Sequence, residues 1–113
     1  MEIKRLLAID DCRELPDAHV LCRTFDDGIK ALDFLGPWDE LWLDHDLGAL
    51  MTSNGDGCKV VEWLNEHKEK YPDTIIVITG SPAGFDRIVG ALRDGGVMEQ
   101  HINRHSLWTK KII

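Results

Sequence analysis

Two acidic pairs follow short apolar runs in this chain. Asp10 and Asp11 come after "RLLAI", and Asp44 and Asp46 flank His45 after "LWL". Carboxylates within a few ångströms of one another repel, so they must either share protons or bind a cation. Mg²⁺ prefers oxygen ligands and keeps bound waters that a phosphate oxygen can replace. The four aspartates therefore predict a divalent-metal site, provided that the fold brings them together.

A further polar group follows the apolar run 74–79, "TIIVIT". Thr79 and Ser81 offer hydroxyl groups, and "SPAG" leads into an expected helix whose N-terminus can receive an anion. Carboxylates, hydroxyls and a helix N-terminus together are typical of a phosphate site. Each part also has a simpler interpretation, because "DD" can begin a turn and Thr79 can merely end a strand. Their joint placement at strand ends favours the site.

The histidines leave alternatives open. His45 could act as a general acid or base near physiological pH, but if Asp44 points into the site, strand alternation turns His45 away and favours a structural role. His101 and His105 are four apart and would share one face of a helix, where they could contribute to a zinc site. Arg104 or His105 could instead contact phosphate, or all three could be ordinary surface residues.

The pattern of apolar residues predicts alternating strands and helices. We expect strands at 3–9, 19–25, 41–43 and 74–79, with 19–25 nearer an edge. We expect helices from Asp26 or Asp27 to Leu35, from Val60 to Tyr71, and one that includes 85–92 and is ended by "DGG" at 94–96. This alternation is typical of an α/β fold with a mainly parallel sheet and helices on its faces. The polar groups then share the edge where such sheets bind ligands, beside a candidate flap at 48–57.

The first connection is unusually short. Nine residues, "DCRELPDAH", separate the first two apolar runs, whereas a parallel crossover usually needs about a dozen or more residues. Either the first helix is reduced to an extended link, or this strand pair is antiparallel.

Composition limits the classes of partner. A chain of 113 residues with 43% hydrophobic residues predicts a single domain, 1–113, although the path of 97–113 and the oligomeric state stay open. The net charge of −7 argues against a broad nucleic-acid-binding face, while a bound cation still permits a small phosphate ligand. No apolar run reaches about 20 residues, so no membrane span is expected. Three cysteines without C-x-x-C spacing favour reduced, packed thiols and a cytoplasmic location, although Cys58 could have a lowered pKa at a helix start.

Four segments resemble a response-regulator receiver domain over roughly residues 3–96. They are "LLAIDD" at 6–11, "DELWLDHDLG" at 39–48, "NGDGCKVVEWL" at 54–64 and "TIIVITGS" at 74–81. The resemblance implies a three-layer αβα, flavodoxin-like domain with its first helix reduced or missing. It also implies that Asp10 and Asp11 help to hold Mg²⁺, that Asp44 accepts phosphate, that the backbone carbonyl of Asp46 binds metal, and that Thr79 is the strand-four hydroxyl.

The departures from that pattern indicate a divergent branch. Receivers carry a lysine, usually followed by proline, at the end of a fifth strand, and no Lys-Pro occurs here. "AIDDCRELP", "LDHDLG" and "SPAG" resemble the receiver-like family named for cyclic-phosphate processing, whose small domains occur in bacteria and phages. The similarity is looser at 79–84, where "TGSPAG" stands in place of an expected His-Ser and Asn-Pro.

Three functional hypotheses follow. The first is an Mg²⁺- or Mn²⁺-dependent phosphoesterase acting on a cyclic phosphate, such as a 2′,3′-cyclic nucleotide end. In it Asp44 is nucleophile or metal ligand, His45 or another strand-end group protonates the leaving hydroxyl, and Arg13 neutralises phosphate charge. The second is a non-catalytic, receiver-derived switch or binding module with Asp44 as phosphoacceptor. The third is an interaction protein that keeps the acidic pocket as a metal-stabilised scaffold for a protein partner.

Overall fold

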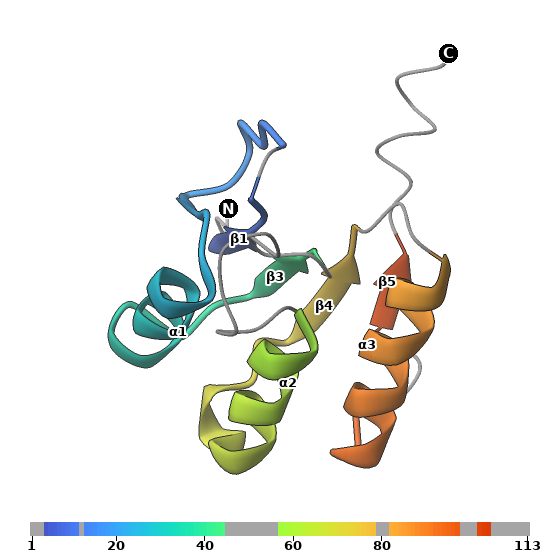
Figure 1. Cartoon of the computed structure of the whole chain (residues 1–113). Helices are drawn as coiled ribbons and strands as arrows, with labels where there is room; N and C mark the ends of the chain where they lie inside the picture. Colours follow the sequence, from blue (N-terminus) through green and yellow to red (C-terminus); the bar gives the residue numbers. More distant parts are fainter. Residues whose placement is uncertain (1–3, 12, 45–56, 79–81, 98–101, 105–113) are drawn as a thin grey trace.

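A computed structural model of the chain describes residues 4–11, 13–44, 57–78, 82–97 and, as backbone only, 102–104. Strands and helices alternate along most of the chain (Figure 1). The strands are β1 (Leu6–Ile9), β2 (Val20–Cys22), β3 (Glu40–Leu43), β4 (Thr74–Val77) and β5 (Ile102–Arg104). The helices are α1 (Phe25–Phe34), α2 (Gly57–Glu66), the short 3-10 helix η1 (Lys68–Lys70) and α3 (Pro82–Asp94).

The strands form one parallel sheet in the order β2-β1-β3-β4-β5. This confirms the predicted α/β fold and the edge position of the second strand. The order reverses between β1 and β3, which is where open α/β sheets bind ligands. Ile9 of β1 pairs with Leu43 of β3, so the residues that follow them, Asp10 and Asp44, leave the sheet side by side.

The link between β1 and β2 replaces the first helix. β1 and β2 are parallel, so the antiparallel alternative is wrong, and the described residues of the link contain a turn but no helix. Leu15 and Ala18 pack with Ala8 and Ile78 against the sheet, and the Ala18 N–H donates to the Leu15 carbonyl at 3.0 Å. A few apolar side chains thus anchor a crossover that is too short for a helix.

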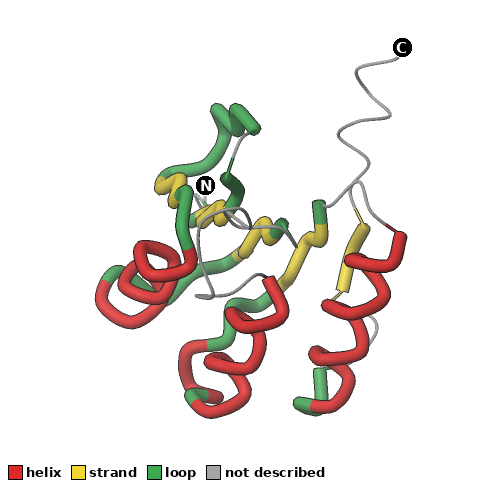
Figure 2. Tube along the Cα trace, in the orientation of Figure 1, coloured by secondary structure: helices red, strands yellow, loops and turns green. Residues whose placement is uncertain are grey.

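The main core lies between one face of the sheet and the helices (Figure 2). The sheet contributes Leu7, Ile9, Leu41, Leu43, Ile75 and Val77, which alternate with residues of the other face. The helices contribute Ala31, Leu32, Val60, Val61, Leu64, Ile88 and Leu92. Within the described residues the helices therefore form one layer, and the link covers the second face beside β1.

Several helix boundaries differ from the sequence-based expectations. α2 begins at Gly57 rather than Val60, and α3 begins at Pro82 rather than at residue 85. α1 is capped by Thr24, whose hydroxyl accepts from the Asp27 N–H at 3.1 Å. The expectation of a cap at Asp26 or Asp27 is wrong, because both lie in the first turn, where their negative charge favours the helix dipole.

α2 ends at Glu66 rather than continuing to Tyr71. His67 leaves the helical conformation (φ −133°, ψ 65°), its Nδ1 lies 2.8 Å from the Trp63 carbonyl oxygen, and its ring stacks on that of Trp63. A side chain that bonds the backbone in this way competes with continuation of the helix. α3 ends as expected at "DGG", where Gly96 has a positive φ of 89°.

The remaining expectations concern the flap and the C-terminal segment. The candidate flap at 48–57 lies almost wholly outside the described residues. Residues 102–104 form β5, parallel to β4, so the helix on which the His101 and His105 zinc hypothesis depended is wrong for this segment. Both histidines, and the side chain of Arg104, are outside the described part of the chain. Among the described residues, no helix has the length and apolar character needed to cross a membrane.

We predict that Thr24→Ala lowers the free energy of unfolding by about 1 kcal/mol, because the Asp27 N–H loses its capping acceptor. Thr24→Ser keeps the hydroxyl and should stay within a few tenths of the wild-type value. Urea denaturation followed by circular dichroism measures both. Equal stabilities of the alanine and serine variants would contradict the assigned cap.

Candidate functional site

Asp10 and Asp44 are held in place by the backbone pairing of three strands. The Asp10 N–H donates to the Cys22 carbonyl at 2.9 Å, and the Asp44 N–H donates to the Ile9 carbonyl at 3.0 Å. Both residues are buried, with exposed fractions of 0% and 4%. Two carboxylates are therefore fixed next to one another where water has little access.

Asp11 completes a cluster of three carboxylates. One oxygen from each of Asp10, Asp11 and Asp44 lies within 4.8 Å of the other two, and Asp11 is only partly buried. Three of the four aspartates predicted from the sequence thus lie together. Asp46, the fourth, lies outside the described residues, as does His45.

Arg13 places a positive charge between the two buried carboxylates. Its Nη1 lies 2.9 Å from Asp10 Oδ2 and 3.4 Å from Asp44 Oδ2, and its backbone N–H donates to Asp10 Oδ1 at 3.0 Å. A buried carboxylate is costly unless it is paired and hydrogen-bonded. The guanidinium therefore stabilises both charges, while the predicted contact of Arg13 with phosphate stays a prediction.

Arg23 supports the backbone of the link that carries Arg13. Its Nη1 donates to the Arg13 carbonyl at 2.7 Å and lies 3.4 Å from the Asp10 carbonyl, while Nη2 contacts Glu14 at 3.3 Å. The sequence did not indicate this role, because nothing in the spacing of Arg23 and Arg13 shows that the link folds back over β2. Arg23 lay within the expected strand 19–25, whereas β2 ends at Cys22, one residue before it.

Gly57 lets α2 begin against the end of β3. A Cβ at Gly57 would overlap the Asp44 carbonyl oxygen and come within 3.0 Å of Ile88 Cδ1. Only a glycine therefore allows this close approach of the first residue of α2 to the backbone of Asp44. The sequence motif "NGDG" indicated a loop but not this packing requirement.

The hydroxyl side of the predicted site is only partly described. Ile78 donates its N–H to the Leu43 carbonyl at 3.1 Å, so β4 ends beside the residue that precedes Asp44. α3 then begins at Pro82, and Gly84 is buried in its first turn. Thr79 and Ser81, which lie between these elements in sequence, are outside the described residues.

Cys58 packs against the core, in agreement with the packing interpretation of that thiol.

The donor set of this site suits a hard divalent cation. Three carboxylates from Asp10, Asp11 and Asp44 provide oxygen ligands close enough to share one ion. With the Arg13 guanidinium, the formal charges sum to −3 + 1 = −2. Mg²⁺ or Mn²⁺ would balance that charge and leave coordination positions for a phosphate oxygen, so the residues present fit the metal that the sequence predicts.

We predict that Gly57→Ala lowers the free energy of unfolding by about 1–3 kcal/mol, because its Cβ would overlap a backbone atom of Asp44. Gly90→Ala in α3 is the matched control, since a Cβ there meets nothing within 4 Å. Because alanine has a higher helix propensity than glycine, Gly90→Ala should leave the free energy of unfolding unchanged or raise it by up to about 1 kcal/mol. Urea titration of both variants decides the matter, and equal effects would refute the close approach.

Comparisons with known proteins agree with this architecture. A solved CheY-like response regulator receiver domain from Methanospirillum hungatei JF-1 is 16% identical, with 98% of this chain and 91% of that chain covered and a TM-score of 0.62. A fusion containing the yeast Spc42 trimeric coiled coil is 15% identical, with 99% and 75% covered and a TM-score of 0.62. At these identities the two structures are evidence for the fold alone, and they confirm the predicted receiver-like fold.

The sequence comparison is more specific. No curated protein is significantly similar to the chain. The family model described as "Cyclic-phosphate processing Receiver domain" matches residues 5–94, which run from the start of β1 to the end of α3 and include Asp10, Asp11, Arg13 and Asp44. The chain therefore belongs to the cyclic-phosphate processing receiver domain family.

Proposed function

We propose that this domain is an Mg²⁺- or Mn²⁺-dependent phosphoesterase that opens a cyclic phosphate, such as a 2′,3′-cyclic nucleotide end. The observation that carries the proposal is the convergence of three carboxylates within 4.8 Å of one another, beside a guanidinium, at the carboxyl ends of β1 and β3. The family to which the chain belongs is named for processing of this substrate class.

Asp10, Asp11 and Asp44 are the residues that would hold the metal, together with Asp46 as the sequence predicts. When bound, the metal would polarise the phosphoryl group and lower the pKa of a bound water. The burial of Asp10 and Asp44 supports this assignment, because a cation can compensate carboxylates that solvent cannot reach.

The reaction would add water across one ester bond of the cyclic phosphate. A new bond forms between water oxygen and phosphorus, one phosphorus–oxygen ester bond breaks, and the released alkoxide takes up a proton. The products are a phosphate monoester and a free hydroxyl group. His45 or another strand-end group would donate that proton, and Arg13 would neutralise charge on the phosphoryl oxygens.

The expected substrate is a small phosphorylated ligand or a terminal cyclic phosphate rather than a length of nucleic acid. The chain carries a net charge of −7, which disfavours broad contact with a phosphate backbone. Thr79, Ser81 and the N-terminus of α3 would contact the phosphoryl group at the same edge of the sheet. We propose a cytoplasmic location because three cysteines without C-x-x-C spacing favour reduced thiols. Burial and the nearby Asp27 raise the pKa of the Cys22 thiol, which favours its protonated, unreactive form.

The second candidate is a receiver-derived switch or binding module in which Asp44 accepts a phosphoryl group. The receiver fold favours it. The burial of Asp44, which is 4% exposed and contacts Arg13, disfavours direct attack by its carboxylate on an external phosphodonor. We therefore rank it below the phosphoesterase.

Incubation with 2′,3′-cyclic nucleotides and Mn²⁺ or Mg²⁺, followed by phosphorus NMR, tests the proposal. We predict conversion to a single monoester isomer, which identifies the bond that breaks. Asp44→Asn should reduce the rate at least about a hundred-fold, because it removes a charged ligand of the metal that would activate the attacking water.

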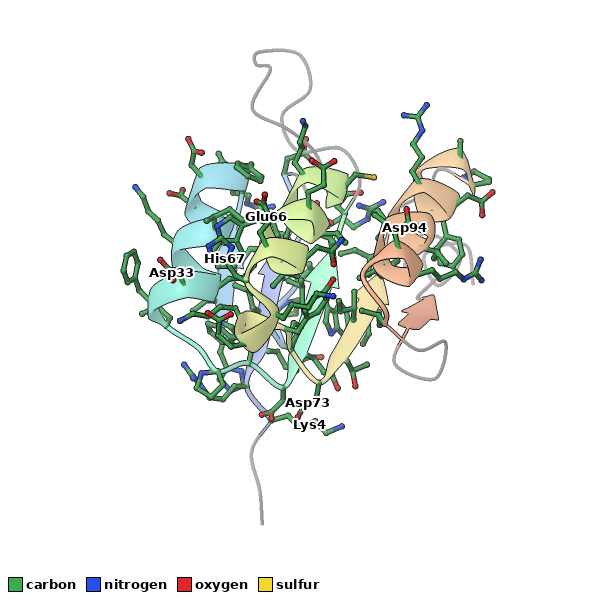
Figure 3. All side chains as sticks on the ribbon, turned by 90° about the horizontal axis from the view of Figure 1, so that it is seen from below. Lys4, Asp33, Glu66, His67, Asp73 and Asp94 are labelled. Carbon is green, nitrogen blue, oxygen red and sulfur yellow. The ribbon has the colours of Figure 1, made fainter. Side chains whose placement is uncertain are left out.

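Asp73→Asn is the matched control, since Asp73 is exposed at the amino-terminal edge of the sheet, near Lys4 and away from the site (Figure 3). It should keep the wild-type rate. Absence of turnover by the wild-type protein under conditions in which metal binding is detected would refute cyclic nucleotides as substrates. Phosphorylation of Asp44 by a small acyl phosphate would then favour the switch.

A further inference from the structure

Arg13 engages both buried carboxylates at the position where a cation would bind. Its Nη1 contacts Oδ2 of Asp10 at 2.9 Å and Oδ2 of Asp44 at 3.4 Å. The carboxylate side chains are 0% and 6% exposed, whereas that of Arg13 is 18% exposed, so Arg13 has the largest contact with solvent of these three side chains. A metal ion that binds these two Oδ2 atoms would meet the guanidinium there.

We propose that Arg13 is a built-in counter-ion that competes with the divalent cation for Asp10 and Asp44 and thereby sets the metal affinity of the site. This inference rests on the metal dependence in the proposed function. Without metal, the guanidinium neutralises the buried carboxylates. When the metal binds, the guanidinium leaves their Oδ2 atoms and becomes available to a negatively charged ligand.

Electrostatics makes simultaneous binding unfavourable. A divalent cation that shares Asp10 Oδ2 or Asp44 Oδ2 with Arg13 would lie within a few ångströms of a guanidinium that is always charged, and like charges at that range repel strongly in a poorly hydrated site. The cation carries the larger charge and gains ligands from three carboxylates. The mobile partner in the exchange is therefore the arginine side chain.

The backbone allows the guanidinium to move without dismantling the link. The Arg13 N–H stays on Asp10 Oδ1, and Arg23 holds the Arg13 carbonyl at 2.7 Å. These bonds fix both sides of the Arg13 Cα, while the side chain reaches the carboxylates through rotatable bonds. Arg13 is thus an anchored residue with a side chain that can change partners close to the site.

The test is the affinity of the whole chain for Mn²⁺, measured by isothermal titration calorimetry. Removing the guanidinium changes the formal charge of the site from −2 to −3, because only the three carboxylates remain. We predict that Arg13→Gln binds Mn²⁺ at least about ten-fold more tightly than wild type. Arg13→Lys keeps the charge and should bind much less tightly than Arg13→Gln. Lys4→Gln removes one exposed charge far from the site and should bind as wild type does.

A second measurement covers the case in which Arg13→Gln fails to fold. In wild-type protein with ¹⁵N-labelled arginine, Mg²⁺ titration should shift the Arg13 Nε–H resonance, assigned with Arg13→Lys. The resonance of Arg23, which contacts backbone carbonyls and Glu14 but no carboxylate of the cluster, should move much less.

Unchanged or weaker Mn²⁺ binding by Arg13→Gln would overturn the counter-ion inference and make Arg13 a positioning residue. The proposed function would still stand in that case, provided that the wild-type protein binds the metal. An unmoved Arg13 resonance at saturating Mg²⁺ would also overturn it. Lack of metal binding by every variant would overturn the metal dependence itself, and the counter-ion inference with it.

Discussion

The structure depends on holding two negative charges inside the protein. Asp10 and Asp44 end adjacent parallel strands, and the hydrogen bond from the Asp44 N–H to the Ile9 carbonyl fixes their separation. Neither side chain can turn far into water, so charge compensation must come from within the site. The contacts of Arg13, the support from Arg23 and the glycine at Gly57 all maintain this arrangement.

The loss of the first helix and the position of Arg13 belong together. A helix after β1 would direct the chain away along the sheet, whereas the short link turns back through an Asp10–Arg13 hydrogen bond and packs Leu15 against Ala8. This path brings an arginine to the acidic cluster. The sequence contains no Lys-Pro, and within the described residues the link supplies the guanidinium that contacts Asp10 and Asp44.

The sequence predicted most of the scaffold because its strands are short apolar runs that end in polar residues. Asp10, Asp11 and Asp44 could be grouped from that pattern, since parallel strands place their carboxyl ends at one edge. The end of α2 was not predicted, because the helical pattern continues past His67, and the pattern of apolar residues does not show that the His67 side chain bonds the Trp63 carbonyl one turn earlier. The partner of Arg13 was missed for a similar reason: its contact with Asp44 crosses from the link to β3, and local spacing carries no information on it.

The central claim is that the carboxyl ends of β1 and β3 form a divalent-cation site. The most direct test is a crystal of the wild-type chain soaked in Mn²⁺, with data collected near the manganese absorption edge. We predict one strong anomalous peak within coordination distance of Asp10, Asp11 and Asp44, with the Arg13 guanidinium displaced from Oδ2 of Asp10 and of Asp44. A saturated crystal without a peak among these carboxylates, or with the only peaks elsewhere on the surface, would contradict it.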